Sequence, residues 1–267
     1  MMQIAVTGAA GRMGKEIIGV ILSNPGLRLC GALESAQCAL LGIDAGETAG
    51  AGKGGVKITD QPDRAFKKAD VIIDFSAPEA SMRHLEFAVR YKKAIVIGTT
   101  GFSHGQREKI KELSAGARVL MSPNMSIGVN LLFKLVSESA KALGKDYDIE
   151  ITEAHHRHKK DAPSGTAMRI AEVIAGAINC DLEKTAVYGR KGIIGERRSE
   201  EIGIFSIRAG DIVGDHTVLF GGPGERIEIT HKASSRETFA RGAVKAAVWL
   251  EGKAEGLYDM QDVLGLK

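Results

Sequence analysis

The sequence predicts an α/β protein in two parts: a doubly wound parallel Rossmann-type sheet, and a second α+β domain built on an open mixed or antiparallel sheet. In the first half, short and continuously apolar runs alternate with helical patterns. Such runs are typical of parallel strands covered on both faces. The first run leads directly into a glycine-rich turn. In the second half apolar and polar residues alternate, which indicates strands with one buried face.

Five short apolar runs carry the predicted parallel sheet. Apolar residues recur every three or four positions from Met13 to Leu22, after the first run, which predicts an amphipathic helix. Pro78 predicts another helix start after the third run, because proline is favoured at the first helical position. The runs are residues 4–7, 27–33, 71–75, 94–97 and 119–121.

The second half begins near Ser126 with a predicted helix that ends before Gly144, a residue type common just past helix ends. Residues 147–151 alternate like a half-buried strand, and a further helix is predicted from Ser164 to about residue 178. We therefore expect a domain boundary near Ser126.

Three later runs are joined by short connections, which predicts an antiparallel meander. An amphipathic helix then closes the sequence, and its pattern alone does not say which domain it joins. The three runs are residues 202–207, 212–220 and 226–230, and the apolar positions of the last helix are Phe239, Ala243, Ala247 and Leu250.

Length and composition fit an ordinary globular protein of 267 residues, for which two domains are the natural expectation. The 36 basic and 33 acidic residues leave a net charge of +3, too small to argue for nucleic acid or membrane binding. The three cysteines Cys30, Cys38 and Cys180 are widely spaced and form no CxxC pair, so neither disulfides nor zinc is indicated. No signal peptide or long apolar run is present, and a cytoplasmic location is expected.

The glycine turn after the first run, from Gly8 to Gly14, has the spacing GxxGxxG, a variant of the dinucleotide fingerprint. Glycines permit a tight turn and close approach to a pyrophosphate, and the amides at the following helix start favour an anion. Glu34 ends the second run, where an acidic residue is expected for the ribose. The alternative is a plain strand–helix turn whose glycines serve packing alone.

Other strand ends support a ligand at the same edge of the sheet, because ligands of open parallel sheets bind at the carboxyl ends of strands. Residues 76–78, 98–101 and 122–125 follow the third, fourth and fifth runs, and most of them are small or can form hydrogen bonds. Turns prefer the same residue types, so each segment alone is a weak signal.

Residues 153–166 form the most unusual segment, since three of the seven histidines, His155, His156 and His158, fall within four positions. Histidine can give or take a proton near neutral pH, and neighbouring cations such as Lys159 favour release of the proton. Ser164 is a predicted N-cap, which leaves the following amides able to bind a carboxylate.

Three other interpretations compete for this segment. A run of charged residues commonly forms a solvent-exposed surface with no further function. The spacing of His155 and His158 could bind a metal, but no cysteine or carboxylate has convincing ligand spacing nearby, so no metal is expected. RNA binding would need aromatic residues between the basic ones, and none are there. His84, His104 and His216 are interpreted as structural or surface residues.

Residues 6–14, 98–102, 153–159 and 161–167 resemble the signatures of the 4-hydroxy-tetrahydrodipicolinate reductase family, also called dihydrodipicolinate reductases. Residues 208–214 and 230–236 are also similar to family segments, so the resemblance runs over nearly the whole chain. The histidine-rich segment is specific to the family, whereas many dehydrogenases share the glycine turn.

The resemblance implies that a cyclic imine dicarboxylate is reduced to tetrahydrodipicolinate in lysine and diaminopimelate biosynthesis, with NADH or NADPH, by a homotetramer. It implies a dinucleotide-binding domain of residues 1–126 plus 236–267, and a substrate-binding and oligomerisation domain of residues 127–235. His155 and Lys159 match the family's proton donors, and His156, Gly165 and Thr166 match its substrate-binding positions. The matching cofactor positions are Gly8, Ala9, Ala10, Gly11, Arg12, Met13, Glu34, Gly98, Thr99, Thr100, Ser122, Pro123, Asn124 and Met125.

One position departs from some family members, which place an arginine after the acidic residue of the second strand. Here that residue is Ser35, while Glu34 favours a free ribose diol and repels a phosphate. NADH is therefore expected to serve at least as well as NADPH, although Arg12 can compensate in part.

Two other functions fit parts of the pattern. Another two-domain dehydrogenase would share the glycine turn but has no need of the histidine segment. A non-catalytic dinucleotide sensor would bind the cofactor and tolerate loss of His155 and Lys159.

Overall fold

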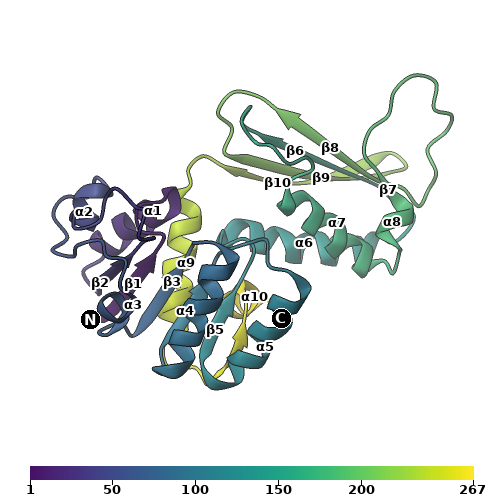
Figure 1. The fold of residues 1–267 in the computed structure, drawn as a ribbon. Coiled ribbons are helices and arrows are strands. Elements are labelled where there is room, and N and C mark those ends of the chain that lie inside the picture. The colour runs from purple at the N-terminus through teal and green to yellow at the C-terminus, as the bar shows by residue number, and fades with distance from the viewer. The chain divides into compact units, whose positions relative to one another are not determined.

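The computed structural model describes all 267 residues, which form two compact units. The first comprises Met1–Ile127 and Arg236–Lys267, and the second comprises Gly128–Ser235. The chain therefore leaves the first unit once and returns to it at its C-terminal end, as the purple-to-blue and yellow segments of Figure 1 show.

The first unit is built on a six-stranded parallel sheet, which confirms the predicted fold class. All neighbouring strands run parallel, and the fifth predicted strand is followed at the sheet edge by β11, a strand that the sequence pattern did not predict. It has only three residues and no apolar run to announce it. The order is β2 (Leu27–Leu33), β1 (Met2–Thr7), β3 (Val71–Asp74), β4 (Ala94–Ile97), β5 (Arg118–Met121) and β11 (Gly256–Tyr258).

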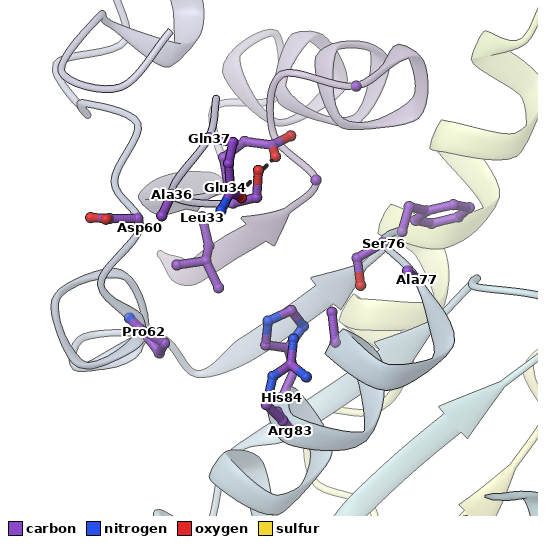
Figure 2. Close-up of a pocket in the computed structure, with 15 residues that line it drawn as sticks. Leu33, Glu34, Ala36, Gln37, Asp60, Pro62, Ser76, Ala77, Arg83 and His84 are labelled. Carbon is purple, nitrogen blue, oxygen red and sulfur yellow. Dashed lines mark hydrogen bonds between the residues drawn. The ribbon is translucent and has the colours of Figure 1, made fainter. Parts of the chain in front are cut away.

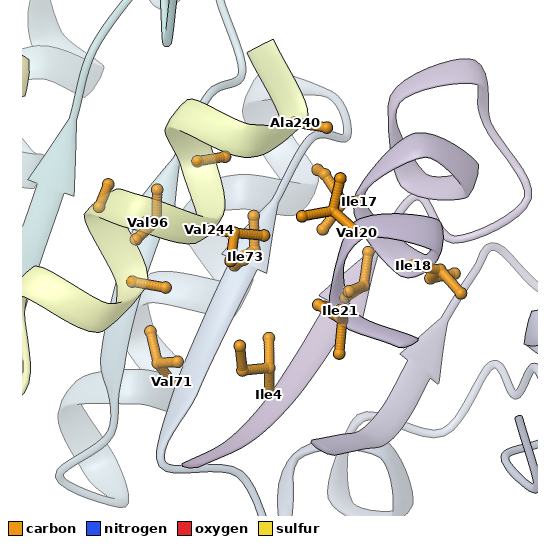
Figure 3. Packing of buried hydrophobic residues seen from close by; sticks show 14 of the residues in the cluster. Ile4, Ile17, Ile18, Val20, Ile21, Val71, Ile73, Val96, Ala240 and Val244 are labelled. Atoms are coloured by element: carbon orange, nitrogen blue, oxygen red, sulfur yellow. The ribbon is translucent and has the colours of Figure 1, made fainter. Parts of the chain in front are cut away.

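Helices cover both faces of this sheet. Successive residues of a strand point to opposite sides, so neighbouring residues of one strand enter different cores. Ile73 belongs to a core cluster with residues of α1 and α9, whereas Ile72 lies in a second cluster with residues of α4 and α5. Figure 3 shows the first cluster between β1, β3, α1 and α9. The helices are α1 (Arg12–Leu22), α2 (Ala45–Thr48), α3 (Pro62–Phe66), α4 (Pro78–Arg90), α5 (His104–Leu113), α9 (Glu237–Trp249) and α10 (Met260–Leu264).

The last long helix, α9, packs beside α1 in the first unit. Gly242 allows this packing, since a Cβ at that position would lie 1.8 Å from the carbonyl oxygen of Met125. A side chain there would force the helix away from the segment that follows β5.

The second unit has a five-stranded mixed sheet. β6 is its central strand and pairs parallel with β8 and antiparallel with β9. The predicted antiparallel meander is therefore wrong for its first strand: only β9 and β10 form the hairpin. The alternation of residues reveals a strand but not its neighbour, which long-range pairing decides. The order is β10 (Glu225–Ala233), β9 (Gly214–Gly222), β6 (Asp148–His155), β8 (Ile202–Arg208) and β7 (Ala186–Val187).

Two helices, α6 (Ile127–Leu143) and α7 (Gly165–Ala177), cover one face of this sheet, and α8 (Leu182–Thr185) follows them. Ile149 and Ile151 of β6 point into the resulting core. Because strand side chains alternate, Glu153 and His155 lie on the same buried face beyond the end of that core. No helix of this unit covers the opposite face (Figure 1).

No helix in the chain combines the length and the apolar character that crossing a bilayer requires. The three cysteines form no disulfide.

Candidate active site

The turn between β1 and α1 requires glycine at two positions. Gly8 has a φ of +62°, and a Cβ there would lie 2.2 Å from the carbonyl oxygen of Phe75. A Cβ on Gly14 would lie 2.1 Å from the carbonyl oxygen of Gly8, so α1 starts in direct contact with the turn. Close packing therefore explains why these two positions are glycine. This observation fits a plain strand–helix turn as well as a dinucleotide site.

The start of α1 also has features of an anion site. Its N-cap is Gly11, which is extended and offers no side chain to the first amides of the helix. Those amides and the positive end of the helix dipole are a general binding site for phosphate. Glu34 stands beside the turn: one oxygen accepts the N–H of Ala10 at 3.0 Å and the other accepts the N–H of Ser35 at 3.0 Å.

A cavity of about 580 Å³ opens at this edge of the sheet (Figure 2). Gly8, Gly11 and Glu34 line it, together with Ser76 and His84 from the segments after and around β3. A wall of glycine backbone, a carboxylate at the strand end and a free helix start fit the pyrophosphate and ribose of a dinucleotide. Ser35 and Arg83 complete the polar rim, and Leu33, Pro62, Ala77 and Ala80 add apolar surface.

The remaining predicted cofactor positions lie at the same strand ends but do not line the cavity. Gly98 is needed because a Cβ there would lie 2.2 Å from the Phe75 ring. Thr99 is buried, whereas Thr100 is exposed. The hydroxyl of Ser122 donates to the carbonyl oxygen of Asn124 at 2.8 Å. Ala9 and Met125 are buried in the core, Ala10 and Met13 are half-buried, and Arg12 and Pro123 are exposed.

A buried polar network beneath the cavity was not predicted. Asp74, at the end of β3, is fully buried and accepts hydrogen bonds from Thr7 (2.7 Å) and Ser76 (2.6 Å). His84 of α4 lies 3.2 Å from its other oxygen. Burial alone would raise the pKa of Asp74, but the His84 contact and the two hydroxyls lower it below its ordinary value.

The same network extends to the fourth strand, since the hydroxyl of Thr99 accepts hydrogen bonds from the Ser76 amide and the Ser81 hydroxyl, each at 2.9 Å. His84, interpreted from sequence as structural or surface, therefore lies in both the network and the cavity wall. An aspartate inside an otherwise apolar run was the available signal, because such a residue is buried with partners.

In the second unit, the end of β6 presents His155 in a buried setting. Its Nδ1 lies 2.6 Å from Oε2 of Glu153, whose side chain is fully buried. Its Nε2 faces a position where a Cβ on Gly214 would lie 3.1 Å away, so a glycine keeps the space beside this nitrogen open. The sequence indicated cations as neighbours of His155; the group in direct contact is an anion.

The loop after His155 places the other predicted residues in different settings. Nζ of Lys159 lies 3.0 Å from a carboxylate oxygen of Asp161, and its side chain is 22% exposed. His156 is half-buried, and its carbonyl oxygen accepts the N–H of Lys159. Gly165, the first residue of α7, is exposed, and Thr166 is half-buried.

Ser164 is the N-cap of α7, as the sequence predicted, and its hydroxyl accepts the N–H of Ala167 at 3.2 Å. Its own amide donates to Glu153 at 3.1 Å. The start of a 13-residue helix is thus tied to the end of β6. The amides of Gly165 and Thr166 lie in the first turn, where a carboxylate is favoured.

His216 on β9 belongs to the same cluster, although the sequence alone indicates a structural or surface residue. The ring of His216 meets that of His155 edge-on, with centroids 5.3 Å apart. Its Nε2 lies 3.2 Å from the Ser164 hydroxyl, and its buried Nδ1 has no hydrogen-bond partner. Burial and the charge of His155 lower the pKa of His216 to about 4, so the ring is neutral near pH 7.

Chemically, this cluster combines a histidine with an oriented ring, a lysine and an anion-binding helix start within one segment. These groups can hold a dianionic ligand and transfer a proton, and no group of three or more histidine, cysteine or acidic side chains suits a metal ion. The first unit offers a dinucleotide cavity.

Comparison with known proteins relates both units to one family. Residues 2–125 match the family model described as "Dihydrodipicolinate reductase, N-terminus", and residues 128–264 match "Dihydrodipicolinate reductase, C-terminus". Proteins named 4-hydroxy-tetrahydrodipicolinate reductase from Syntrophotalea carbinolica and Hahella chejuensis are each 56% identical over 267 residues, which cover all of both chains.

Solved structures show the same fold. A dipicolinate-bound dihydrodipicolinate reductase from a Paenisporosarcina species has a TM-score of 0.78 with 24% identity, covering 98% of each chain. An amine dehydrogenase from Mycobacterium smegmatis has a TM-score of 0.59 with 12% identity, covering 96% of this chain and 94% of that one.

Proposed function

The chain belongs to the dihydrodipicolinate reductase family. We propose which of its residues bind the cofactor, bind the substrate and supply the proton in an NAD(P)H-dependent reduction. The substrate is the cyclic imine derived from 4-hydroxy-tetrahydrodipicolinate, and the product is tetrahydrodipicolinate, in lysine and diaminopimelate biosynthesis. The first unit binds the cofactor. The second unit, Gly128–Ser235, binds the substrate and supplies the proton.

The cofactor site consists of the glycine turn, the start of α1 and Glu34. The backbone from Gly8 to Met13 would hold the pyrophosphate, and Glu34 would accept hydrogen bonds from the ribose. When bound, the nicotinamide supplies the hydride. The residues after β4 and β5, namely Gly98, Thr99, Thr100, Ser122, Pro123, Asn124 and Met125, would lie along the same edge of the sheet.

The proton comes from His155 or Lys159. One observation carries this proposal: His155 is buried, its Nδ1 is held by Glu153, and a glycine keeps the space at its Nε2 open. Since ionised Glu153 only accepts, Nδ1 carries a hydrogen, and Nε2 is the atom that gains and loses the proton. A positioned acid of this kind speeds protonation of the reduced ring by ~10²–10⁴.

The substrate's carboxylates suit the segment from His156 to Thr166. His156 and the amides of Gly165 and Thr166 would bind them, because the Ser164 hydroxyl already accepts from Ala167 and leaves the first amides of α7 to a ligand. Lys159 adds positive charge close by.

NADH serves at least as well as NADPH in this account. Glu34 lines the cavity and would repel a 2′-phosphate, and Ser35 offers no cation to meet one. Arg83 also lines the cavity and, with Arg12, leaves NADPH usable.

We further propose a homotetramer in the cytoplasm. The uncovered face of the second sheet, with Ile207 half exposed on β8, supports assembly through this unit, and the three unpaired cysteines fit a reducing compartment.

Oxidation of NADH and NADPH tests the function directly. The substrate is generated in situ from pyruvate and aspartate semialdehyde by a synthase, and absorbance of the reduced cofactor is followed. Substrate-dependent oxidation supports the proposal. Cofactor binding without oxidation of either form would favour the dinucleotide-sensor interpretation or another substrate.

A further inference from the structure

Glu153 is the hub of the cluster at the end of β6. It is fully buried, and both of its oxygens accept hydrogen bonds. Oε2 accepts from His155 Nδ1 at 2.6 Å and from Arg208 at 2.8 Å. Oε1 accepts from the Ser164 amide at 3.1 Å and from Arg208 at 2.8 Å. A carboxylate has about four acceptor positions, so both oxygens of Glu153 are well supplied with donors.

Arg208 keeps this carboxylate ionised. Its guanidinium binds both oxygens from β8, where Arg208 lies opposite His155, and it also donates to the carbonyl oxygen of Asp161 at 2.6 Å. Burial would raise the pKa of Glu153, but the hydrogen bonds from Arg208 and His155 lower it to about 2. The group is therefore an anion at every pH at which the enzyme would work.

We propose that Glu153 is a positioning residue for the reduction, whose single carboxylate fixes both the tautomer of His155 and the position of the helix start that binds substrate. The inference rests on the proposed function of His155 and α7. An acceptor on Nδ1 excludes the tautomer with its hydrogen on Nε2, so Nε2 alone exchanges the proton. The amide of Ser164 ties the first turn of α7 to the same group.

This arrangement makes the charge of Glu153 act on the proton of His155. Arg208 on β8 lies opposite His155, and the His216 ring on β9 meets the His155 ring edge-on; neither is an anion. Lys159 and Asp161 on the following loop pair with each other at 3.0 Å. His231 on β10 lies opposite His216 and one strand further away. Glu153 is thus the anion in direct contact with the His155 ring.

The test compares Glu153→Gln, Glu153→Asp and the wild type for kcat and substrate KM against pH, with cofactor affinity measured separately. Loss of the anion in Glu153→Gln lowers kcat about 10- to 100-fold, because the acid is no longer held in position, and moves the alkaline limb of kcat to lower pH. Glutamine has one acceptor oxygen in place of two, so it cannot accept from both His155 and the Ser164 amide; substrate KM therefore rises, while the dissociation constant of NADH stays within about twofold.

Glu153→Asp separates charge from geometry. It keeps the anion but shortens its reach, so the alkaline limb stays at its wild-type position while kcat falls and substrate KM rises. Since Asp retains the pair with Arg208, this variant also serves if Glu153→Gln does not fold.

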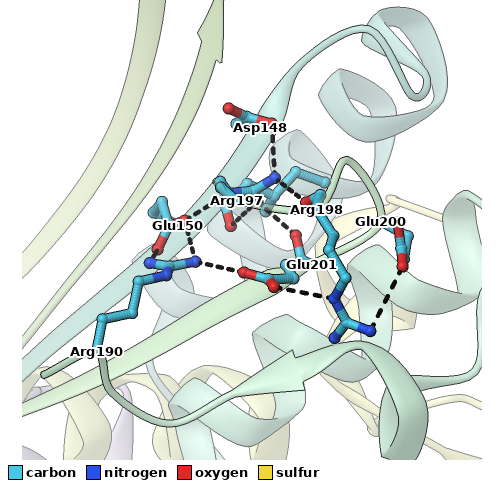
Figure 4. A network of polar contacts seen from close by, with 8 residues as sticks. Asp148, Glu150, Arg190, Arg197, Arg198, Glu200 and Glu201 are labelled. Carbon is cyan, nitrogen blue, oxygen red and sulfur yellow. Dashed lines mark hydrogen bonds and ion pairs between the residues drawn. The ribbon is translucent and has the colours of Figure 1, made fainter. Parts of the chain in front are cut away.

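Glu150→Gln is the matched control. Glu150 lies three residues earlier on β6, on the opposite face, and also accepts a bidentate pair from an arginine, Arg190, at 3.0 and 2.9 Å (Figure 4). Arg197 adds a third contact at 3.0 Å. Loss of this pair should leave the pH profile and substrate KM unchanged.

An active wild type together with an unshifted limb and unchanged KM in Glu153→Gln would overturn the inference while leaving the proposed function intact. A shift of equal size in Glu150→Gln would overturn it too. An inactive wild type would instead refute the proposed function.

Discussion

The rings of His155 and His216 meet edge to face, with centroids 5.3 Å apart. Both lie on the buried face of the second sheet, and both contact groups that hold the start of α7: Glu153 for His155 and the Ser164 hydroxyl for His216. Two protonated imidazoles in such contact would repel each other, so a charge on one ring disfavours protonation of the other. His216 is therefore the ring of the pair that stays neutral near pH 7.

Because the buried His216 ring is neutral in the folded protein, the free energy of unfolding is expected to fall in acid. The pKa of His216 is lowered from 6.5 in the unfolded chain to about 4 in the folded protein. Between these values the unfolded state binds more protons, so the free energy of unfolding falls as the pH drops from about 6.5 to about 4. In His216→Gln the slope should be shallower by ~1 kcal/mol per pH unit.

Urea unfolding at half-unit pH intervals measures this slope. Glutamine is chosen because its amide can still reach the Ser164 hydroxyl. Equal slopes for the variant and the wild type would show that His216 titrates normally.

The glycine turn predicts a sharp contrast between two glycines. Gly8→Ala should destabilise the protein by at least ~2 kcal/mol and abolish tight NADH binding, because alanine disfavours a φ of +62° and its Cβ would meet the Phe75 carbonyl. Gly19→Ala, in the middle of α1, has nothing within 4 Å of the added carbon and should stabilise by ~0.5–1 kcal/mol.

Thermal unfolding and NADH titration of both variants check the contrast. Wild-type stability and affinity in Gly8→Ala would mean that the turn adopts another conformation.

Cofactor preference is predicted to depend on the residue after Glu34. Ser35→Arg should raise the ratio of NADPH to NADH efficiency about tenfold, the factor that ~1.4 kcal/mol of added transition-state binding gives. Ser35→Gln, long and polar but uncharged, is the control and should change the ratio little. Paired kcat/KM values decide: a strong NADPH preference already in the wild type would contradict the role assigned to Glu34.

Much of the first unit could be predicted because its strands are buried on both faces and appear as continuous apolar runs. β11 has no such run, and its place depends on a neighbour 138 positions earlier, Arg118 pairing with Gly256. Likewise the position of β8 beside β6 follows from pairing over more than 50 residues, which local patterns do not encode.

Site residues that belong to a local sequence motif could be predicted. Those that are brought to the site only by tertiary packing were missed. Glu153 and His216 each continue an alternating run of buried residues, after Ile149 and Ile151 on β6 and before Val218 on β9. That alternation was available in the sequence as a signal for buried, partnered polar groups. Their contacts with Arg208 and Ser164 depend on the sheet and could not be read from spacing.

The most direct test of the account replaces both proposed proton donors at once. His155→Ala combined with Lys159→Ala should lower kcat by at least ~10³ while the dissociation constant of NADH stays within about twofold, because the cofactor cavity is formed by the first unit alone. Turnover and NADH binding are measured on the same preparation. That result would assign the proton to this segment. Unchanged turnover would remove both residues from the mechanism and contradict the central claim.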